Sequence, residues 1–335
     1  MVARPHAHGW MLTIGCLGAL TIAVGQAFAQ TTVVAGTADD ETMVSLADGR
    51  GLHLKCSGEG QPTVILDAGL GLDSSVWIRV QPALAAITRT CAYDRAGYGQ
   101  SDPGPLPRDT AGRTNDLVAL LDATAEPGPF VLVGHSAAEL PARLAAARRP
   151  DLVAGLVLVD PGADLKALQA IGPVWAAAHE TGQSAALTCV RATAAGEMRP
   201  GNAVYAECGS PPVGSRMASR EMAVAVLSEN EPDPGGGSQA AIPLGDTPVI
   251  VLTAANKFGE NEGAGPDETR SLRQVWAEAG ARIAASSSRG EQRLVPDASH
   301  VIQFEQPQAV IAAVRDVVSE VRAGSGGQLA VSAQR

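Results

Sequence analysis

The sequence predicts an α/β protein, built on a mainly parallel eight-stranded sheet with helices on both faces. Short, continuously apolar runs such as TVILDAG (from Thr63) and GLVLVDP (from Gly155) are typical of strands that are buried on both sides. Alanine-rich stretches with helical spacing separate most of these runs. Because strands that alternate with helices form parallel sheets, the two observations together indicate this class.

The individual elements follow from Met43 onward. MVSLA and LHLKCSG are expected to form an opening hairpin, since the turn residues DGRG lie between them. Six later strands are expected in TVILDAG, TCAYD, FVLVGHS, GLVLVDP, PVIVLTA and RLVPDA. Helices are expected in QPALAAIT, NDLVALLDATA, LPARLAAARRP and QAVIAAVRDVV. In the third of these helices, Leu140, Leu144 and Ala145 share one face.

One segment interrupts this alternation. More than eighty residues separate the strand VLVDP from the strand PVIVLTA. This length is too great for a simple connection in a compact sheet, so we expect an inserted, mainly helical cap over residues 162–247. The sheet domain would then comprise residues 43–161 and 248–322. The last stretch, residues 323–335, is expected to be a disordered tail.

Composition and charge restrict the partners. The chain of 335 residues is 45% hydrophobic but only 3% aromatic, so its core must be built mainly from Ala, Val and Leu. Its formal net charge is -10. Nucleic acid and anionic membranes both require a basic face on the protein, so neither is an expected partner.

Residues 1–29 have the features of a secretory signal peptide. One Arg precedes an apolar stretch from Trp10 to about Gly25, and small residues stand at Ala27 and Ala29. We expect cleavage after Ala29 and export to the periplasm or the extracellular space, with no membrane attachment afterwards. The alternative is an uncleaved anchor, but the apolar stretch is shorter than the ~20 residues that span a bilayer.

Export would give the cysteines a structural meaning. Of the five cysteines, Cys16 lies within the apolar stretch, which leaves an even number in an oxidising compartment. The four that remain allow three pairings, among which the sequence does not choose: Cys56, Cys91, Cys189 and Cys208. The sequence has no Cys-x-x-Cys pair or Cys/His cluster, so no metal site is expected.

A candidate nucleophile lies in LVGHSAAEL, residues 132–140. Ser136 stands between an apolar run and a helical one, which is the context of a strained strand-to-helix turn that exposes a nucleophilic hydroxyl. Such a turn requires small residues two positions before and two positions after the serine. Gly134 and Ala138 meet this requirement. The alternative is that Ser136 only caps the helix.

Two further features favour a serine hydrolase site. A glycine-bearing loop follows the strand TVILDAG, and the backbone amides of Leu70 and Ala137 would stabilise an oxyanion; the alternative is a simple glycine turn. Near the C-terminus, His300 follows the last strand, which suits a general base that activates the serine. His135 is a rival, but a residue next to the nucleophile points away from its hydroxyl. The other candidates are expected to be structural or exposed: His53 on the hairpin and His179 in the cap.

These stretches together resemble the α/β-hydrolase fold superfamily, in its serine-nucleophile branch. The resemblance covers about residues 43–323 and rests on DAGLG, CAYDRAGYGQSD, LVGHSAA and VPDASHVIQFEQP. The second motif is similar to one in proline iminopeptidases, epoxide hydrolases and small esterases. Relatives that act on epoxides or haloalkanes use an aspartate nucleophile, so Ser136 disfavours those reactions. The resemblance implies catalysis without a metal or an organic cofactor.

The resemblance also guides the search for the acid that orients His300. In the common arrangement this acid follows strand 7, where the chain has Asn256 and Lys257, neither of which can serve. Some relatives place it after strand 6, and here Asp160 ends that strand. We therefore favour Asp160, although a turn or capping role would also suit it. Three other carboxylates are alternatives for the acid: Glu260, Glu262 and Asp297.

The implied fold assigns further roles. Strands 2 and 4 are neighbours in it, which would pair Cys56 with Cys91 and leave Cys189 and Cys208 to pair inside the cap. The loop after strand 4 is structural in relatives, so three of its residues receive no catalytic role: Asp94, Arg95 and Tyr98.

Glu139 stands where relatives usually have glycine. A carboxylate in the first turn of a helix is favoured by the helix dipole, which is a sufficient reason for its presence. A second hypothesis is that a carboxylate near the oxyanion hole disfavours anionic substrates. Comparing Glu139→Gln with the native chain on an anionic and a neutral ester distinguishes the two.

We therefore expect an exported serine hydrolase that cleaves carboxylic esters of small molecules through Ser136, His300 and Asp160, with an acyl-enzyme intermediate. Amides and lactones require the same constellation. One alternative is a catalytically silent protein that binds a small molecule or a partner, which the altered turn at Ala138 and Glu139 and the missing acid after strand 7 motivate. Another is a cofactor-free perhydrolase or acyltransferase that uses the same triad. The sequence predicts no oligomeric state.

Overall fold

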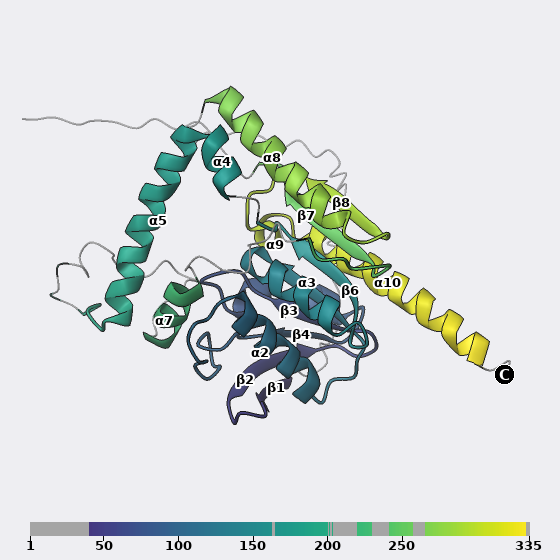
Figure 1. Cartoon of the computed structure of the whole chain (residues 1–335). Helices are drawn as coiled ribbons and strands as arrows, with labels where there is room; N and C mark the ends of the chain where they lie inside the picture. Colours follow the sequence, from purple (N-terminus) through teal and green to yellow (C-terminus); the bar gives the residue numbers. More distant parts are fainter. Residues whose placement is uncertain are drawn as a thin grey trace, which may run out of the picture. The chain divides into compact units, whose positions relative to one another are not determined.

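The computed structural model describes residues 40–162, 165–199, 201, 203, 220–229, 241–256 and 265–332. Within these ranges, an eight-stranded sheet has the order β1-β2-β4-β3-β5-β6-β7-β8 (Figure 1). Its strands are β1 (Asp40–Ser45), β2 (Gly51–Ser57), β3 (Thr63–Asp67), β4 (Thr90–Tyr93), β5 (Phe130–His135), β6 (Val153–Val159), β7 (Val249–Ala254) and β8 (Gly290–Val295).

The pairing of these strands confirms the predicted mainly parallel sheet. From β4 to β8 every neighbouring pair is parallel. β2 is antiparallel to both β1 and β4, so β1 and β2 form the expected opening hairpin. Because the parallel strands all point the same way, their carboxyl ends lie along one edge of the sheet, where the loops that carry functional residues begin.

Helices cover both faces of the sheet, as Figure 1 shows. Elements packed on one face are α2 (Thr110–Ala123), α3 (Glu139–Arg148) and α8 (Pro266–Ala284). Elements packed on the other are α1 (Gln81–Ala85) and α10 (Pro307–Ser332). Shorter helices are η1 (Ser74–Trp77), η2 (Ser136–Ala138) and α9 (Ile302–Glu305). Among the described residues, no helix combines the length and the apolar character needed to cross a membrane.

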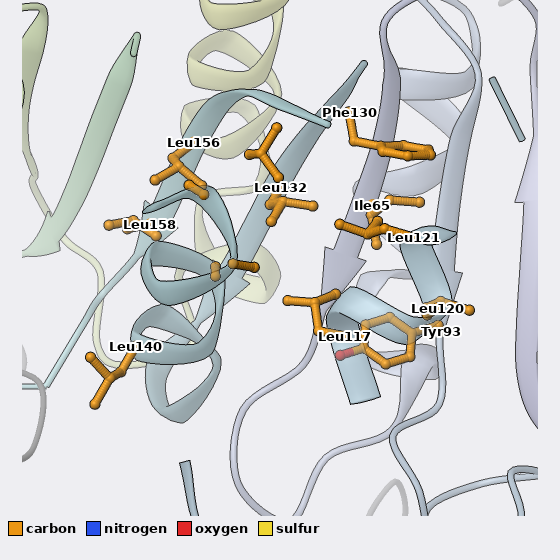
Figure 2. Close-up of a cluster of buried hydrophobic side chains, with 14 of the residues drawn as sticks. Ile65, Tyr93, Leu117, Leu120, Leu121, Phe130, Leu132, Leu140, Leu156 and Leu158 are labelled. Atoms are coloured by element: carbon orange, nitrogen blue, oxygen red, sulfur yellow. The ribbon is translucent and has the colours of Figure 1, made fainter. Parts of the chain in front are cut away.

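The strands are apolar throughout because each of their two faces is covered. In β5, Leu132 belongs to the cluster beneath α2 and α3, whereas Val131 and Val133 belong to the cluster beneath α10. Successive strand residues point to opposite sides, so every position needs an apolar side chain. Figure 2 shows the first cluster, in which Leu117 and Leu120 of α2 face the strands.

The segment expected to form a cap contains α4 (Leu165–Ile171), α5 (Pro173–Ala194) and α7 (Arg220–Glu229). Leu168 of α4 packs against Leu272 and Trp276 of α8. Beyond α7, the sheet domain resumes earlier than the expected boundary at residue 248, because Ile242 and Leu244 belong to the cluster beneath α2 and α3.

α10 continues to Ser332 and so includes residues 323–332 of the stretch for which a disordered tail is expected. The prediction rested on the position of this stretch at the end of the sequence, where order is poor unless the segment is tied down. A helix that is already formed gains one backbone hydrogen bond for each residue added, so its extension is much easier than its nucleation. Residues 333–335 lie outside the described residues, as does the expected signal peptide.

A disulfide joins Cys56 of β2 to Cys91 of β4, which confirms this predicted pairing. The two residues are opposite each other in the antiparallel ladder, with their Cα atoms 4.0 Å apart. Cys189 in α5 is also disulfide-bonded. Cys208, its predicted partner, lies outside the described residues.

Candidate active site

The turn after β5 has the geometry expected of a nucleophile turn. Ser136 directly follows the strand and has a φ of 52°, a left-handed conformation that non-glycine residues rarely adopt. The turn is tight, because a Cβ atom placed on Gly134 would lie 2.8 Å from the carbonyl oxygen of Ala138. Ala138 itself is buried. The size restriction inferred at both positions therefore has a steric cause.

Ser136, His300 and Asp160 form a chain of hydrogen bonds. The Ser136 Oγ hydroxyl donates to His300 Nε2 at 2.8 Å. On the opposite side of the ring, His300 Nδ1 donates to Asp160 Oδ2 at 2.6 Å. In this arrangement the imidazole can accept the serine proton while the carboxylate stabilises the resulting imidazolium.

Asp160 is held rigidly at the end of β6. Its side chain is fully buried, and its φ is 47°. The Oδ1 atom accepts hydrogen bonds from the backbone N–H of Ala254 at 2.9 Å and from Trp276 Nε1 at 2.8 Å. With Oδ1 occupied by these two donors, Oδ2 is left facing His300. Trp276, which lies on α8, was not anticipated from the sequence.

The other candidate acids do not reach His300 in the described structure. Asp297 is exposed, and its Oδ1 atom accepts a weak hydrogen bond from Asn256 Nδ2 at 3.4 Å. Glu260 and Glu262 lie outside the described residues. Among the described acids, Asp160 is thus the one paired with the histidine.

His135 contacts the loop of His300 rather than the serine hydroxyl. Its Nε2 atom donates to the backbone carbonyl of His300 at 2.9 Å, and the two rings lie 4.9 Å apart between centroids. His135 is buried, so it supports the loop from below. His53 is also buried, with Nδ1 3.0 Å from Asp94 Oδ2. The side chain of His179 lies outside the described part of the structure.

The loop after β3 approaches the serine closely. A Cβ atom on Gly69 would lie 2.7 Å from His135 Nδ1 and 3.1 Å from Ser136 Cβ, so glycine is required for this approach. Arg95 holds the loop: its Nη1 donates to the carbonyl oxygen of Ala68 and its Nη2 donates to that of Gly69 at 2.9 Å. Leu70 is the next residue along this loop.

The turn that carries Ala137 is held in a similar way from α2. Arg113 Nη1 donates to the carbonyl oxygen of Ala137 at 2.9 Å. A buried guanidinium thus fixes the backbone on each side of the serine. Arg95 has the structural role expected of it, whereas Arg113 was not singled out in the sequence.

Glu139 lies beneath this turn rather than facing solvent. Its side chain is 1% exposed, and Arg143 Nη1 donates to its Oε1 atom at 2.6 Å. Burial raises the pKa of this carboxyl to about 7, although Arg143 and Arg113 act in the opposite direction. An ion pair buried in this way does not support the hypothesis that Glu139 repels anionic substrates.

Solved hydrolases share this fold. A hydrolase from Pseudomonas aeruginosa PA01 aligns with 84% of this chain and 99% of its own, at a TM-score of 0.56 and 26% identity. A thermophilic esterase from Thermogutta terrifontis aligns with 85% of this chain and 99% of its own, at a TM-score of 0.52 and 21% identity. The enol-lactonase from Burkholderia xenovorans LB400 aligns with 83% of this chain and 100% of its own, at a TM-score of 0.54 and 22% identity.

Sequence relatives match over a shorter region. The provisionally named carbamate hydrolase RutD of Klebsiella pneumoniae (strain 342) is 39% identical over 103 residues, which is 30% of this chain and 38% of that protein. The karrikin insensitive 2 receptor CA of Petunia hybrida is 32% identical over 111 residues, 32% of this chain and 41% of the receptor. The chain thus spans about two fifths of the length of these curated relatives. The model of the alpha/beta hydrolase family matches residues 64–313, and the chain therefore belongs to this family.

Proposed function

We propose that the protein is a serine hydrolase that cleaves carboxylic esters through an acyl-enzyme. The observation that carries the proposal is the hydrogen-bonded chain from Ser136 Oγ through His300 to Asp160. Ser136 attacks the acyl carbon while His300 takes its proton, and His300 then protonates the leaving alcohol. Water repeats the sequence on the acyl-enzyme and releases the acid, and Asp160 orients the imidazole in both halves.

The oxyanion that forms in each step requires donors on the other side of the carbonyl. We assign this role to the backbone amides of Leu70 and Ala137. The close approach of Gly69 to Ser136 supports the assignment, because it brings the loop beside the reacting oxygen. The hold of Arg95 and Arg113 on the carbonyls of Gly69 and Ala137 supports it further, since donors that are already in place need no reorganisation during the reaction.

An ester is the substrate class that fits best. An esterase and an enol-lactonase are among the proteins of similar fold. An alkoxide leaving group requires only one protonation by His300, which the geometry of the chain provides. Carbamates are a related class that the name of the RutD relative brings into consideration. The complete hydrogen-bonded chain favours a hydrolase over the silent binding protein suggested by the altered turn.

We also propose that the protein is exported. The disulfide between Cys56 and Cys91 supports this location, because such bonds persist in oxidising compartments. The signal-like features of residues 1–29 in the sequence agree with it. Mass measurement of the expressed protein tests the proposal: cleavage after Ala29 in the exported fraction supports it, and an uncleaved chain confined to the cytosol contradicts it.

The experiment for the hydrolase is a series of p-nitrophenyl esters of increasing acyl length. The expected result is turnover with a burst of p-nitrophenol at early times when deacylation is slower than acylation, and no turnover by Ser136→Ala. Folded native protein that hydrolyses none of the esters, nor a phenyl carbamate, would contradict the proposal and favour a binding protein. Perhydrolysis or acyl transfer is identified by adding peroxide or an alcohol to the same assay.

A further inference from the structure

Glu229, the last residue of α7, lies where the cap segment meets the core. Its side chain is fully buried. The Oε2 atom accepts a hydrogen bond from the Tyr98 hydroxyl at 3.1 Å and from Arg95 Nη2 at 3.4 Å. Arg113 Nη1 is 4.0 Å from the same oxygen. One carboxylate from the cap segment therefore contacts the two guanidiniums that hold the backbone beside Ser136.

The contact with Arg95 leads directly to a proposed oxyanion donor. Arg95 Nη2 also donates to the carbonyl oxygen of Gly69 at 2.9 Å. The peptide group between Gly69 and Leu70 is planar and trans, so its C=O and N–H point in opposite directions. Fixing the Gly69 carbonyl therefore fixes the direction of the Leu70 N–H. On the other side, Arg113 holds the carbonyl of Ala137.

The charge of Glu229 is needed as well as its position. The side chains of Arg95 and Arg113 are only 4% and 9% exposed, and a guanidinium does not lose its proton in a protein. Asp67 pairs with Arg95 at 3.2 Å. Asp67 and Glu139 also attract Arg113, but only over a longer distance, whereas Glu229 is the described carboxylate within 4.0 Å of it. A buried cation that loses its counter-charge turns toward other acceptors or toward water. Without Glu229, both guanidiniums would loosen their hold on the two backbone carbonyls.

We propose that Glu229 is a positioning residue, through which the docking of α7 on the core aligns the donors of the oxyanion hole. The inference rests on the proposed ester hydrolysis. Apolar packing of α7 supplies the docking, since Met222, Ala225 and Val226 share a buried cluster with Tyr98. Glu229 then completes the ion network, so the hole is properly formed only while α7 is in place.

The test compares Glu229→Gln, which preserves the size of the side chain, with Glu221→Ala, which removes an exposed acid from the same helix. Three quantities are measured: kcat and KM on a p-nitrophenyl ester, Ki for a trifluoromethyl ketone that forms a tetrahedral oxyanion on Ser136, and amide hydrogen exchange of residues 68–72. Thermal unfolding of each variant shows that it is folded at the assay temperature.

For Glu229→Gln we expect kcat to fall about 10-fold or more with KM nearly unchanged, because the affected interaction exists only in the transition state. Ki should rise by a similar factor, and the Leu72 N–H, which donates to the Gly69 carbonyl oxygen at 3.1 Å, should exchange faster. Glu221→Ala should match the native protein in all three. Native Ki and native exchange in folded Glu229→Gln would overturn the inference, whatever its kcat. If the native protein hydrolyses no ester, the proposed function fails, whereas the exchange comparison still decides on Glu229.

Discussion

Among the described residues, two buried aspartates are each bonded to Nδ1 of a histidine, and we propose that only one of these pairs takes part in catalysis. His300 lies 2.6 Å from Asp160, and His53 lies 3.0 Å from Asp94. The pairs differ at the other ring nitrogen. Nε2 of His300 lies 2.8 Å from the Ser136 hydroxyl oxygen, whereas Nε2 of His53 lies 3.4 Å from the side-chain amide nitrogen of Gln100.

The two pairs also differ in exposure and in backbone conformation. The His300 side chain is 39% exposed, so substrate can reach it, whereas that of His53 is 7% exposed. Ser136 and Asp160 both have positive φ angles, a strain that tertiary structure must maintain and that is concentrated at functional sites. Asp94 instead accepts backbone N–H groups from Ser74 and Gln100, which ties loops together. An aspartate–histidine pair thus becomes a site only with a nucleophile and with access.

The largest expected effect separates the two aspartates. Asp160→Asn should lower kcat about 10⁴-fold. Ala254 N–H and Trp276 Nε1–H hold the Oδ1 oxygen, so the new amide would direct its NH₂ group at His300 Nδ1. That contact forces the imidazole proton onto Nε2, where the ring can no longer accept the serine proton. The measurement is steady-state hydrolysis of a p-nitrophenyl ester by folded protein.

Asp94→Asn is the matched control for this change. It alters an equally buried carboxylate bonded to a histidine, but we expect stability to fall while kcat stays within about threefold, since only structural hydrogen bonds are weakened. Equal losses of kcat in the two variants would remove the distinction between the pairs.

The next effect concerns the disulfide, which joins β2, the strand that carries His53, to β4, the strand that Asp94 follows. Replacing both Cys56 and Cys91 by alanine opens a link between residues 35 positions apart. In the chain-entropy model this lowers the free energy of unfolding by roughly 4 kcal/mol. Urea unfolding measures the loss, and kcat at a temperature where the variant is folded should be native. A low kcat in fully folded protein would show that the region of the disulfide and the His53 pair is coupled to the site of Ser136.

Glu139, which lies beneath the turn of Ser136, is expected to make the stability of the protein depend on pH. Its pKa is raised from 4.5 to about 7 in the folded state, so the folded protein binds this proton more tightly than the unfolded chain does. The free energy of unfolding should therefore fall by about 3 kcal/mol between pH 4.5 and pH 7 through this group. Urea unfolding at several pH values measures the slope. Glu139→Gln cannot titrate, and an unchanged slope in that variant would contradict the assignment.

The smallest effect concerns the support of Asp160. Trp276→Phe removes one donor from Oδ1 while Ala254 retains the other, so we expect kcat to fall about fivefold, the equivalent of one modest hydrogen bond. Trp77→Phe is the control, because it removes an indole that is equally buried but does not contact the acid. A native kcat in Trp276→Phe would show that the indole does not support Asp160, and an equal loss in both variants would assign the effect to packing.

The parts of this site that were predictable are those fixed by strand ends. Ser136, Asp160 and His300 each follow a strand, and parallel strands place their carboxyl ends along one edge. Local patterns in the sequence pointed to Ser136 and His300, whereas the choice of Asp160 came from the resemblance to the α/β-hydrolase fold. The requirement for small residues on each side of the nucleophile turn identified Gly134 and Ala138 as well. The alternation of strands and helices also predicted the sheet, whereas the pairing of Cys56 with Cys91 followed only from the strand order that the resemblance to the α/β-hydrolase fold implies.

The parts that were missed depend on contacts between distant helices. Trp276 is 116 residues from Asp160, and Glu229 is 134 residues from Arg95, and no local spacing encodes either contact. The helix that carries Trp276 did have a signal, since Leu272, Trp276, Ala279 and Ile283 recur with helical period and are buried. Its position against Asp160 still required the folded structure, because the direction of one indole depends on packing.

The central claim is that Ser136 is a nucleophile activated by His300 and Asp160. The most direct measurement is labelling with a fluorophosphonate, followed by mass spectrometry that locates the adduct. We predict one adduct on Ser136 in the native protein, slower labelling in Asp160→Asn, labelling at the native rate in Asp94→Asn, and none in Ser136→Ala. Folded native protein that takes up no label, or that is labelled on a different serine, would contradict the claim.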